Sequence, residues 1–491
     1  METTETLRTR STAALWLWTV VMLAPGCGRS AGRAEPGAHA SLGASPGAID
    51  SAGGSALAGA DAASALDLAR TNDARLATGR SHEHASRELM ALVDQIANRV
   101  ASVRHLAILR PIQRGVLDRD EIVARLRTRV RHEYPPGEIE LEAQVYRLLG
   151  MIPEAMNYEA TVFDLLEEQV AGFYDPDARQ LFIASWLGAE LQTPTLAHEI
   201  DHALQDQHFD IARFTHHVRG MGDAQTAAMA VIEGDATAAM LEFMLSSSGR
   251  SIQQHDPNLE GDSMFSDTST AASSQRLRRA PHALREMLMF PYRAGLELCL
   301  RAYRARGNWT DVDALLRTPP PSTEQVLHAD KLRTHEPPIA VPASVPASLS
   351  PNFVVAYDDV LGELGLRLAL EPNFPRPISS EAAAGWGGDR VVLLEPRGAA
   401  PAAALAQSVL VWTIEFDPGP RAAPDREAIE FERAGAQTLA SRHARGIARS
   451  VPRFTRVIET SPGRVAAIAR AGRRVWIIEN APLEAVERWV F

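Results

Sequence analysis

Apolar residues recur at helical spacing through the first two thirds of the chain. Leu89, Leu92, Ile96 and Val100 would lie on one face of a helix that begins near residue 86, because residues three or four apart in a helix share a face. Spacing and capping residues predict further helices over residues 122–130, 138–149, 160–170, 223–245, 281–306 and 322–332. The pattern therefore predicts a mainly helical domain over residues 86–335.

Two short extended runs interrupt the helical pattern. They cover residues 170–174 and 180–185, and the turn-forming sequence Asp-Pro-Asp-Ala at 175–178 separates them. This arrangement predicts a β-hairpin.

A well-marked helix follows the hairpin. Thr193 can serve as its N-cap. Pro194 suits the first helical turn, because an N–H group in that turn has no acceptor within the helix and proline lacks this N–H. The helix is expected to run from there through His202 toward Phe209.

The last third of the chain has a different pattern. Four prolines between residues 336 and 350 predict a stiff extended linker. Beyond it, short β-prone runs separated by turn signals are typical of strands. The predicted strands cover residues 390–394, 409–416, 453–458, 465–469 and 474–478, with one helix at 425–445. Residues 351–491 are therefore expected to form a smaller α+β domain with an antiparallel sheet, which makes the whole protein α+β.

The beginning of the chain has the layout of a secretory signal. Arg8 and Arg10 precede a short apolar run, and the small residues before Cys27 resemble a bacterial lipoprotein cleavage box. Residues 1–26 are then a signal peptide, Cys27 carries a lipid, and the protein is exported and membrane-anchored, facing the periplasm or the cell exterior. The alternative is a signal peptide cut elsewhere, with Cys27 incidental. Residues 27–85 are rich in Ala, Gly and Ser, which predicts a flexible tether.

Composition narrows the functional classes. With 45% hydrophobic and 23% charged residues the chain is of ordinary globular composition, and its 491 residues exceed what one hydrophobic core usually supports. Its net charge of -11 disfavours nucleic acid as a partner, because such a partner requires a positive surface. The only other cysteine is Cys299, so no disulfide can form within the chain if Cys27 is lipidated.

The sequence His-Glu-Ile-Asp-His at 198–202 carries the clearest chemical signal. On a helix, His198 and His202 lie one turn apart and can bind one ion, and zinc favours such imidazole ligands. Glu199 lies about 100 degrees round the helix, where it can act as a general base toward water at the metal. Only about 0.03 chance occurrences are expected in a chain of this composition. We therefore predict a Zn2+ site with Glu199 as a catalytic residue.

Zinc requires a third protein ligand, and two residues compete for that role. His208 follows His202 by six residues, as in the metzincin signature, but that signature has a glycine where this chain has Gln205. A helix that continues through Gln205 would direct His208 away from the ion. Glu233, on a later predicted helix, gives an arrangement that resembles the gluzincin metallopeptidases, and we predict it as the third ligand.

The two residues after Glu233 carry further expectations. Gly234 inside a helix costs about 1 kcal/mol relative to alanine, which suggests that another backbone or side chain approaches closely there. Asp235 could accept a hydrogen bond from a zinc-bound histidine. Gluzincins place such an aspartate four residues after the ligand glutamate, where this chain has Thr237. Exposure of Asp235 to solvent is the alternative.

Further short blocks extend the similarity beyond this motif. They lie at residues 172–176, 197–209, 233–235, 290–292 and 322–328. Together they resemble an uncharacterised family of exported bacterial proteins related to the gluzincins, over roughly residues 86–335. The resemblance implies a zincin-like fold and the zinc site. In zincins the strand before the active-site helix commonly holds the substrate, and residues 180–185 occupy that place.

Peptide hydrolysis also needs a group that stabilises the negative oxygen. Tyr292, Arg293 and His328 are candidates by residue type. Tyr292 and His328 are the predicted catalytic partners of Glu199, and a structural role is the alternative for each.

These features predict a zinc-dependent peptide hydrolase of the bacterial cell envelope, with a peptide or protein as its substrate. Two alternatives stay open. One is a catalytically silent lipoprotein that binds a partner through residues 351–491, although a structural zinc site would have no need of Glu199. The other is a zinc amidase that acts on envelope peptide stems.

Overall fold

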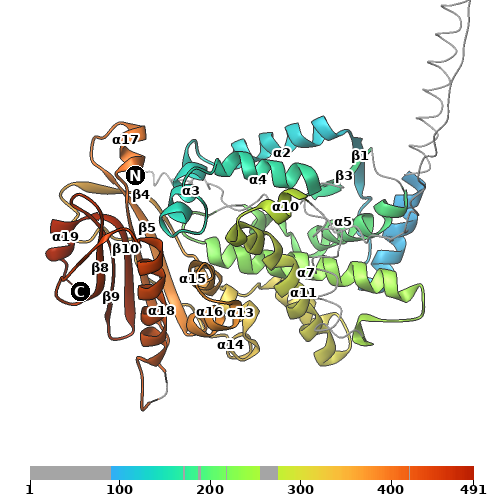
Figure 1. Cartoon of the computed structure of the whole chain (residues 1–491). Helices are drawn as coiled ribbons and strands as arrows, with labels where there is room; N and C mark the ends of the chain where they lie inside the picture. Colours follow the sequence, from blue (N-terminus) through green and yellow to red (C-terminus); the bar gives the residue numbers. More distant parts are fainter. Residues whose placement is uncertain are drawn as a thin grey trace, which may run out of the picture. The chain divides into compact units, whose positions relative to one another are not determined.

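The computed structural model describes residues 90–169, 172–185, 189–216, 218–254, 275–419 and 421–490. Residues 96–491 belong to one compact unit, and residues 90–95 to a second one. The predicted signal peptide, Cys27 and the tether lie outside the described residues. The protein is α+β, as predicted, with a helical first part and a large antiparallel sheet in its last part (Figure 1). Within the described ranges, no helix is both long and apolar enough to cross a membrane.

Helices dominate the first described segment. A helix over residues 90–104 is followed by β1 (Gln113–Leu117), α2 (Arg119–Glu133), α3 (Glu138–Leu148) and α4 (Tyr158–Gln169). The predicted helices in this range are therefore confirmed. At the start of α2 the Asp118 side chain accepts from the backbone N–H of Glu121, and the Glu121 side chain accepts from that of Asp118. This capping box satisfies two backbone groups that a helix start leaves unpaired.

The predicted hairpin forms β2 (Gly172–Asp175) and β3 (Gln180–Ala184), which pair antiparallel. β1 pairs in parallel with the other edge of β3, so the strand order is β1-β3-β2. The sequence did not predict β1, because this segment is short, begins with polar residues and is only partly buried. Since β1 and β2 occupy both edges of β3, residues 180–185 cannot bind a substrate as an added strand. That expectation is wrong.

Three long helices follow, namely α5 (Ala189–Phe209), α7 (Gly222–Ser246) and α11 (His282–Arg306). The predicted end of α5 at Phe209 is confirmed, but its predicted N-cap at Thr193 is wrong, because the helix begins four residues earlier. Pro194 is tolerated inside it at the loss of one backbone hydrogen bond near the helix start. α7 packs against both α5 and α11 and is buried on nearly every face, which explains its alanine-rich composition.

α7 and α11 meet at two glycines. A Cβ atom added at Gly234 would lie 2.2 Å from the carbonyl carbon of Gly295, and one added at Gly295 would lie 1.9 Å from the carbonyl oxygen of Ala230. Only glycine therefore permits this approach of the two backbones. The close approach expected at Gly234 is confirmed, and Figure 1 shows the two helices side by side.

Shorter elements complete the first part. They are α6 (Ala212–Thr215), the 3-10 helix η2 (Ile252–Gln254), α10 (Gln275–Arg279), α12 (Thr310–Arg317), α13 (Thr323–Leu327) and α14 (Ala329–Thr334). The single helix predicted over 322–332 is two helices. Ser322 caps α13 by accepting from the Gln325 N–H, and the extended backbone of His328 separates α13 from α14.

The last part is a seven-stranded antiparallel sheet of order β4-β5-β6-β10-β9-β8-β7. Its strands are β4 (Phe353–Asp359), β5 (Trp386–Pro396), β6 (Val409–Phe416), β7 (Ile447–Arg449), β8 (Phe454–Ser461), β9 (Arg464–Ala471) and β10 (Arg474–Pro482). Its helices are α15 (Gly362–Leu370), α16 (Arg376–Ala383), α17 (Pro401–Ala406), α18 (Arg426–Arg442) and α19 (Leu483–Glu487). α18 packs across β6, β8, β9 and β10.

The predicted strands and the helix at 425–445 are confirmed, whereas β4, β7 and the four short helices were not predicted. β7 has three exposed residues and so shows no hydrophobic alternation. α15 contains Gly362 and Gly365, which are read from sequence as turn residues.

Residues 336–346 of the proline-rich segment belong to no helix or strand, and a turn follows at 347–350. It packs on the sheet, since the Ile339 N–H donates to the Gly387 carbonyl at 2.7 Å and the Val341 and Leu349 side chains are buried. The segment therefore contributes to the hydrophobic core of the last part.

Candidate metal centre

Three side chains converge between α5 and α7. Nε2 of His198 lies 3.0 Å from Nε2 of His202 and 3.1 Å from Oε2 of Glu233. Nε2 of His202 lies 3.5 Å from the same Glu233 oxygen. Each of these residues is at most 2% exposed. The structure thus brings together the three predicted ligands in a group that could hold a metal ion.

The spacing of the three donor atoms fits a tetrahedral ion. Ligands about 2.0 to 2.1 Å from zinc at tetrahedral angles lie about 3.3 Å from one another. In addition, Glu233 Oε1 and His198 Nδ1 are buried and have no hydrogen-bond partner among the described residues. A buried carboxylate oxygen without a donor is unfavourable, and a cation beside it would remove that cost.

Charge within this group also favours a cation. Burial raises the pKa of Glu233, but the two histidines outweigh burial and lower that pKa to about 2. Burial lowers the pKa of His202, but Glu233 outweighs burial and raises that pKa to about 10. For His198, burial dominates and its pKa is lowered. The Glu233 carboxylate thus needs a positive charge beside it, which either a proton on His202 or a metal cation can supply.

Glu199 extends from α5 toward the edge strand β2. Its Oε2 accepts a hydrogen bond from the Tyr174 backbone N–H at 2.7 Å, and the Tyr174 hydroxyl donates to Asp206 Oδ2 at 2.9 Å. Glu199 and Asp206 are two helical turns apart, so Tyr174 contacts α5 at both positions. Burial raises the pKa of Glu199 to about 8, against an opposing effect of His202.

Gln205 connects His202 to α7. Its Oε1 lies 2.9 Å from His202 Nδ1, and its Nε2 lies 2.9 Å from Asp235 Oδ2. Asp235 therefore contacts His202 only through Gln205. The expected direct hydrogen bond from a ligand histidine to Asp235 is not formed. The alternative of a solvent-exposed Asp235 is wrong, because this residue is fully buried and Arg104 Nε donates to its Oδ1 at 2.7 Å.

His208 lies apart from the metal group. α5 continues without a break past Gln205, and Nε2–H of His208 donates to the Ala107 carbonyl at 2.7 Å. The structure therefore brings Glu233, and not His208, to the histidine pair.

The three candidates for oxyanion stabilisation lie in different surroundings. The buried Tyr292 ring stacks on His198, with ring centroids 6.2 Å apart and an interplanar angle of 27°. Arg293 forms an ion pair with Glu286 at 3.6 Å. His328 Nε2 lies 2.9 Å from both carboxylate oxygens of Glu363 in α15. Of the three, Tyr292 contacts a predicted metal ligand.

A second cluster of ligating residue types consists of Glu133, Asp177 and His216. Arg129 already pairs with Glu133 at 3.3 Å and with Asp177 at 3.5 Å. Asp177 and His216 are exposed, so water can solvate them. The buried group on α5 and α7 is the stronger candidate for a metal centre, because within the described residues no arginine or lysine pairs with the Glu233 carboxylate.

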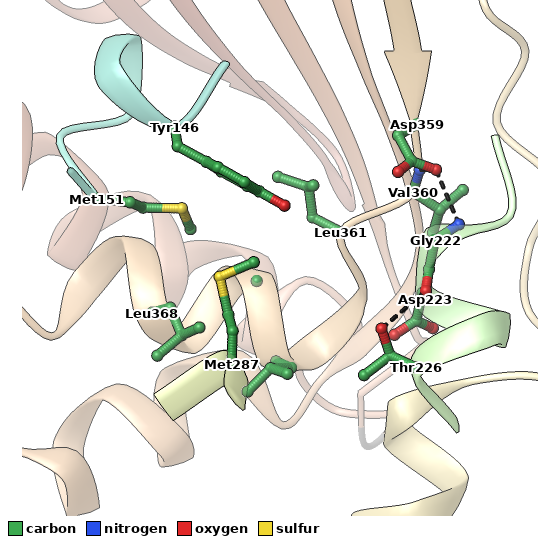
Figure 2. A pocket seen from close by; sticks show the side chains of 12 residues that line it. Tyr146, Met151, Gly222, Asp223, Thr226, Met287, Asp359, Val360, Leu361 and Leu368 are labelled. Atoms are coloured by element: carbon green, nitrogen blue, oxygen red, sulfur yellow. Dashed lines mark hydrogen bonds between the residues drawn. The ribbon is translucent and has the colours of Figure 1, made fainter. Parts of the chain in front are cut away.

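The first turn of α7, the helix that carries Glu233, is held by the last part of the chain. The first N–H groups of a helix have no partner within the helix. Here the Gly222 N–H donates to Asp359 Oδ1 at 2.8 Å, beside a small pocket shown in Figure 2. The Asp223 N–H donates to the Val360 carbonyl at 3.0 Å. The last residue of β4 and the residue after it therefore fix where this ligand helix begins.

Three residues of this centre were not predicted from the sequence. Gln205 follows His202 by three positions, so helical periodicity could have placed it on the same face. Arg104 lies 131 positions from Asp235, and the Tyr174 backbone N–H lies on a separate strand. No local pattern marks either contact.

The last part of the chain matches a known protein family. Residues 353–489 match a family model described as a domain of unknown function (DUF8575). The match begins at the first residue of β4 and does not include the metal centre. No curated protein matches the chain, and no solved structure does.

Proposed function

We propose that the protein is a zinc-dependent peptide hydrolase. The proposal is carried by the buried group of His198, His202 and Glu233, whose donor atoms have the spacing of a tetrahedral zinc site. Structural zinc sites usually have four protein ligands, whereas catalytic sites have three and keep a position for water or substrate. Within the described residues the group has three ligands, with Glu199 next to the first histidine. This arrangement is the one expected of a hydrolase.

The proposed chemistry assigns a task to each nearby residue. Zinc, when bound, polarises a peptide carbonyl and acidifies water. Glu199 takes a proton from the attacking water and passes it to the leaving nitrogen. The Tyr174 N–H holds Glu199 Oε2, so we assign the proton transfer to Oε1. Tyr292 is our candidate for stabilising the negative oxygen, because its ring packs on His198. A direct role of His328 stays a prediction, since Glu363 holds its imidazole.

The proposal is tested with the full chain, purified in detergent, stripped of metal by a chelator and reloaded with zinc. We expect about one zinc per chain by elemental analysis, as one catalytic site requires. The zinc-loaded protein should cleave members of a mixed peptide library, with the products identified by mass spectrometry, and the stripped protein should not. Cleavage of peptidoglycan stems alone would favour the zinc amidase. Bound zinc with no cleavage of either substrate would contradict the hydrolase and favour the silent, partner-binding lipoprotein.

We also propose that a lipid on Cys27 anchors the exported protein to a membrane. The support is the charged start, the apolar run and the small residues that precede this cysteine. Cells that express the chain should incorporate labelled fatty acid into it, and Cys27→Ala should abolish the incorporation. The same substitution at Cys299, which is buried in α11, serves as the control. Equal labelling of the Cys27 variant would show that the anchor is absent or elsewhere.

A further inference from the structure

In each histidine of the metal group, Nδ1 is the ring nitrogen that is not among the three converging donor atoms. The two histidines differ in the hydrogen-bond partner of this nitrogen. His198 Nδ1 has no hydrogen-bond partner among the described residues, whereas His202 Nδ1 lies 2.9 Å from Gln205 Oε1. An amide oxygen can only accept, so this contact requires a proton on Nδ1 of His202. The Nε2 lone pair of His202 is then left for a metal ion.

The orientation of the Gln205 amide is itself determined by its surroundings. Its Nε2 lies 3.1 Å from Asp201 Oδ2, 3.0 Å from the Ile232 carbonyl and 2.9 Å from Asp235 Oδ2. These atoms are acceptors, so they require the NH2 end of the amide on their side. The oxygen end must then face His202. If the amide rotated by 180°, its oxygen would face these acceptor oxygens, and its NH2 group would face the Nδ1–H of His202.

A buried arginine holds the aspartate at the far end of this chain of contacts. Arg104 Nε and Nη2 donate to the two oxygens of Asp235 at 2.7 and 3.2 Å, and Nη2 also donates to Asp313 Oδ1 at 2.7 Å. The Arg104 guanidinium also stacks over the Trp309 ring, 4.5 Å from its centroid. Because Arg104 and Asp235 are fully buried, this bidentate pair is held in one geometry.

We propose that Gln205 is a positioning residue that fixes His202 in the Nδ1–H tautomer, and that the Arg104–Asp235 pair sets the direction of its amide. Ligand histidines usually donate this proton to a carboxylate, a carbonyl or water. Here the acceptor is a neutral side chain on the same helix, and the Asp235 carboxylate that accepts from this side chain is paired with Arg104. The inference rests on the proposed zinc site.

Gln205→Leu tests this role, because leucine keeps the bulk of the side chain but neither accepts nor donates. Loss of a partner of this kind typically weakens metal binding by about 10 to 100-fold. We therefore expect that loss in zinc affinity, measured by competition with a chelator of known affinity. Gln225→Leu is the matched control. Gln225 is a similarly buried glutamine on α7 that bonds to the backbone of residues 216 and 218, so its loss should change zinc affinity less than about twofold.

A second measurement separates positioning from general structural damage. Against the effect of burial, Glu233 raises the pKa of His202 to about 10, so the metal-free, histidine-labelled protein is studied above that pH, where the ring is neutral. Nitrogen-15 NMR then distinguishes the two tautomers, and the His202 signals are identified by their absence from His202→Gln. We expect a single Nδ1–H form in the wild type and in Gln225→Leu, and a mixture in Gln205→Leu. Gln205→Met, which keeps the side-chain length, replaces the leucine variant if that variant does not fold.

The outcomes separate this inference from the proposed function. Equal zinc affinity and equal tautomer populations in the Gln205 and Gln225 variants would overturn the positioning role while leaving the zinc site intact. A wild type that binds no zinc would contradict the proposed function, and the NMR comparison would still decide whether Gln205 sets the tautomer of His202.

Discussion

Glu199→Gln is expected to abolish peptide hydrolysis while about one zinc ion per chain stays bound. Glutamine cannot take up a proton, and removal of a general base typically slows a reaction by about 100 to 10,000-fold. Its amide oxygen can still accept from the Tyr174 N–H, so β2 should keep its contact with α5. Zinc content is measured by elemental analysis, and kcat/KM is measured on a peptide that the wild type cleaves.

Asp206→Asn is the matched control for this experiment. Asp206 is another buried carboxylate of α5, two turns further along, and it contacts Tyr174 and Arg110. Neither of these two partners belongs to the metal group, so we expect kcat/KM to stay within about tenfold of the wild type. A tenfold change corresponds to the loss of a hydrogen bond worth about 1.4 kcal/mol. Near-normal turnover of Glu199→Gln would show that the assigned mechanism is wrong.

Glu233→Ala is expected to cause the largest loss of zinc affinity of any single substitution outside the two histidines. A three-ligand site that loses one ligand is incomplete, so the loss should exceed the roughly 100-fold that follows removal of an outer partner. The substitution also removes the anion next to His198 and His202. Affinity is measured by chelator competition, and the rise in unfolding temperature on adding zinc gives an independent reading of binding.

His208→Ala is the control that the sequence itself offers, because it removes the competing third ligand. His208 bonds to the Ala107 carbonyl and lies outside the metal group, so zinc affinity should change less than about tenfold. X-ray absorption at the zinc edge distinguishes two imidazoles and one carboxylate from three imidazoles. Three imidazoles, or loss of zinc in the His208 variant alone, would overturn the assignment of Glu233.

The last part of the chain helps to position Glu233, because it bonds to the first turn of the helix that carries this residue. A separate binding module would not make such contacts. The last residue of β4 and the residue after it accept hydrogen bonds from the first N–H groups of α7. The side chain of Asp223, in that first turn, accepts from the backbone and hydroxyl of Thr323 and lies against Gly362, where a Cβ atom would collide with it. Gly362 has φ +69°, a conformation that favours glycine. The start of the ligand helix is therefore built from both parts of the chain.

Helical periodicity and residue spacing predicted much of the candidate metal centre. Residues 198 and 202 share a helix face by geometry alone, and the absence of glycine at Gln205 predicted that α5 would continue and carry His208 away. Gly234 in an alanine-rich helix predicted a close backbone approach, which Gly295 provides. These inferences succeeded because each depends on residues within one or two helical turns, where side-chain positions follow from the backbone repeat.

Tertiary structure alone decided which residues complete the site. The parallel pairing of β1 with β3 leaves β3 without a free edge, and Arg104 reaches Asp235 across 131 positions of sequence. The last residue of β4 meets the first turn of α7 across 137 positions. Such contacts depend on how helices and strands pack together. The spacing of apolar residues within one segment does not show which distant segment it will contact. The sequence by itself therefore determined the spacing of the candidate metal ligands and the elements that carry them. Packing decided that Asp235 and Arg104 orient the Gln205 amide toward His202, because those contacts cross from one helix to another.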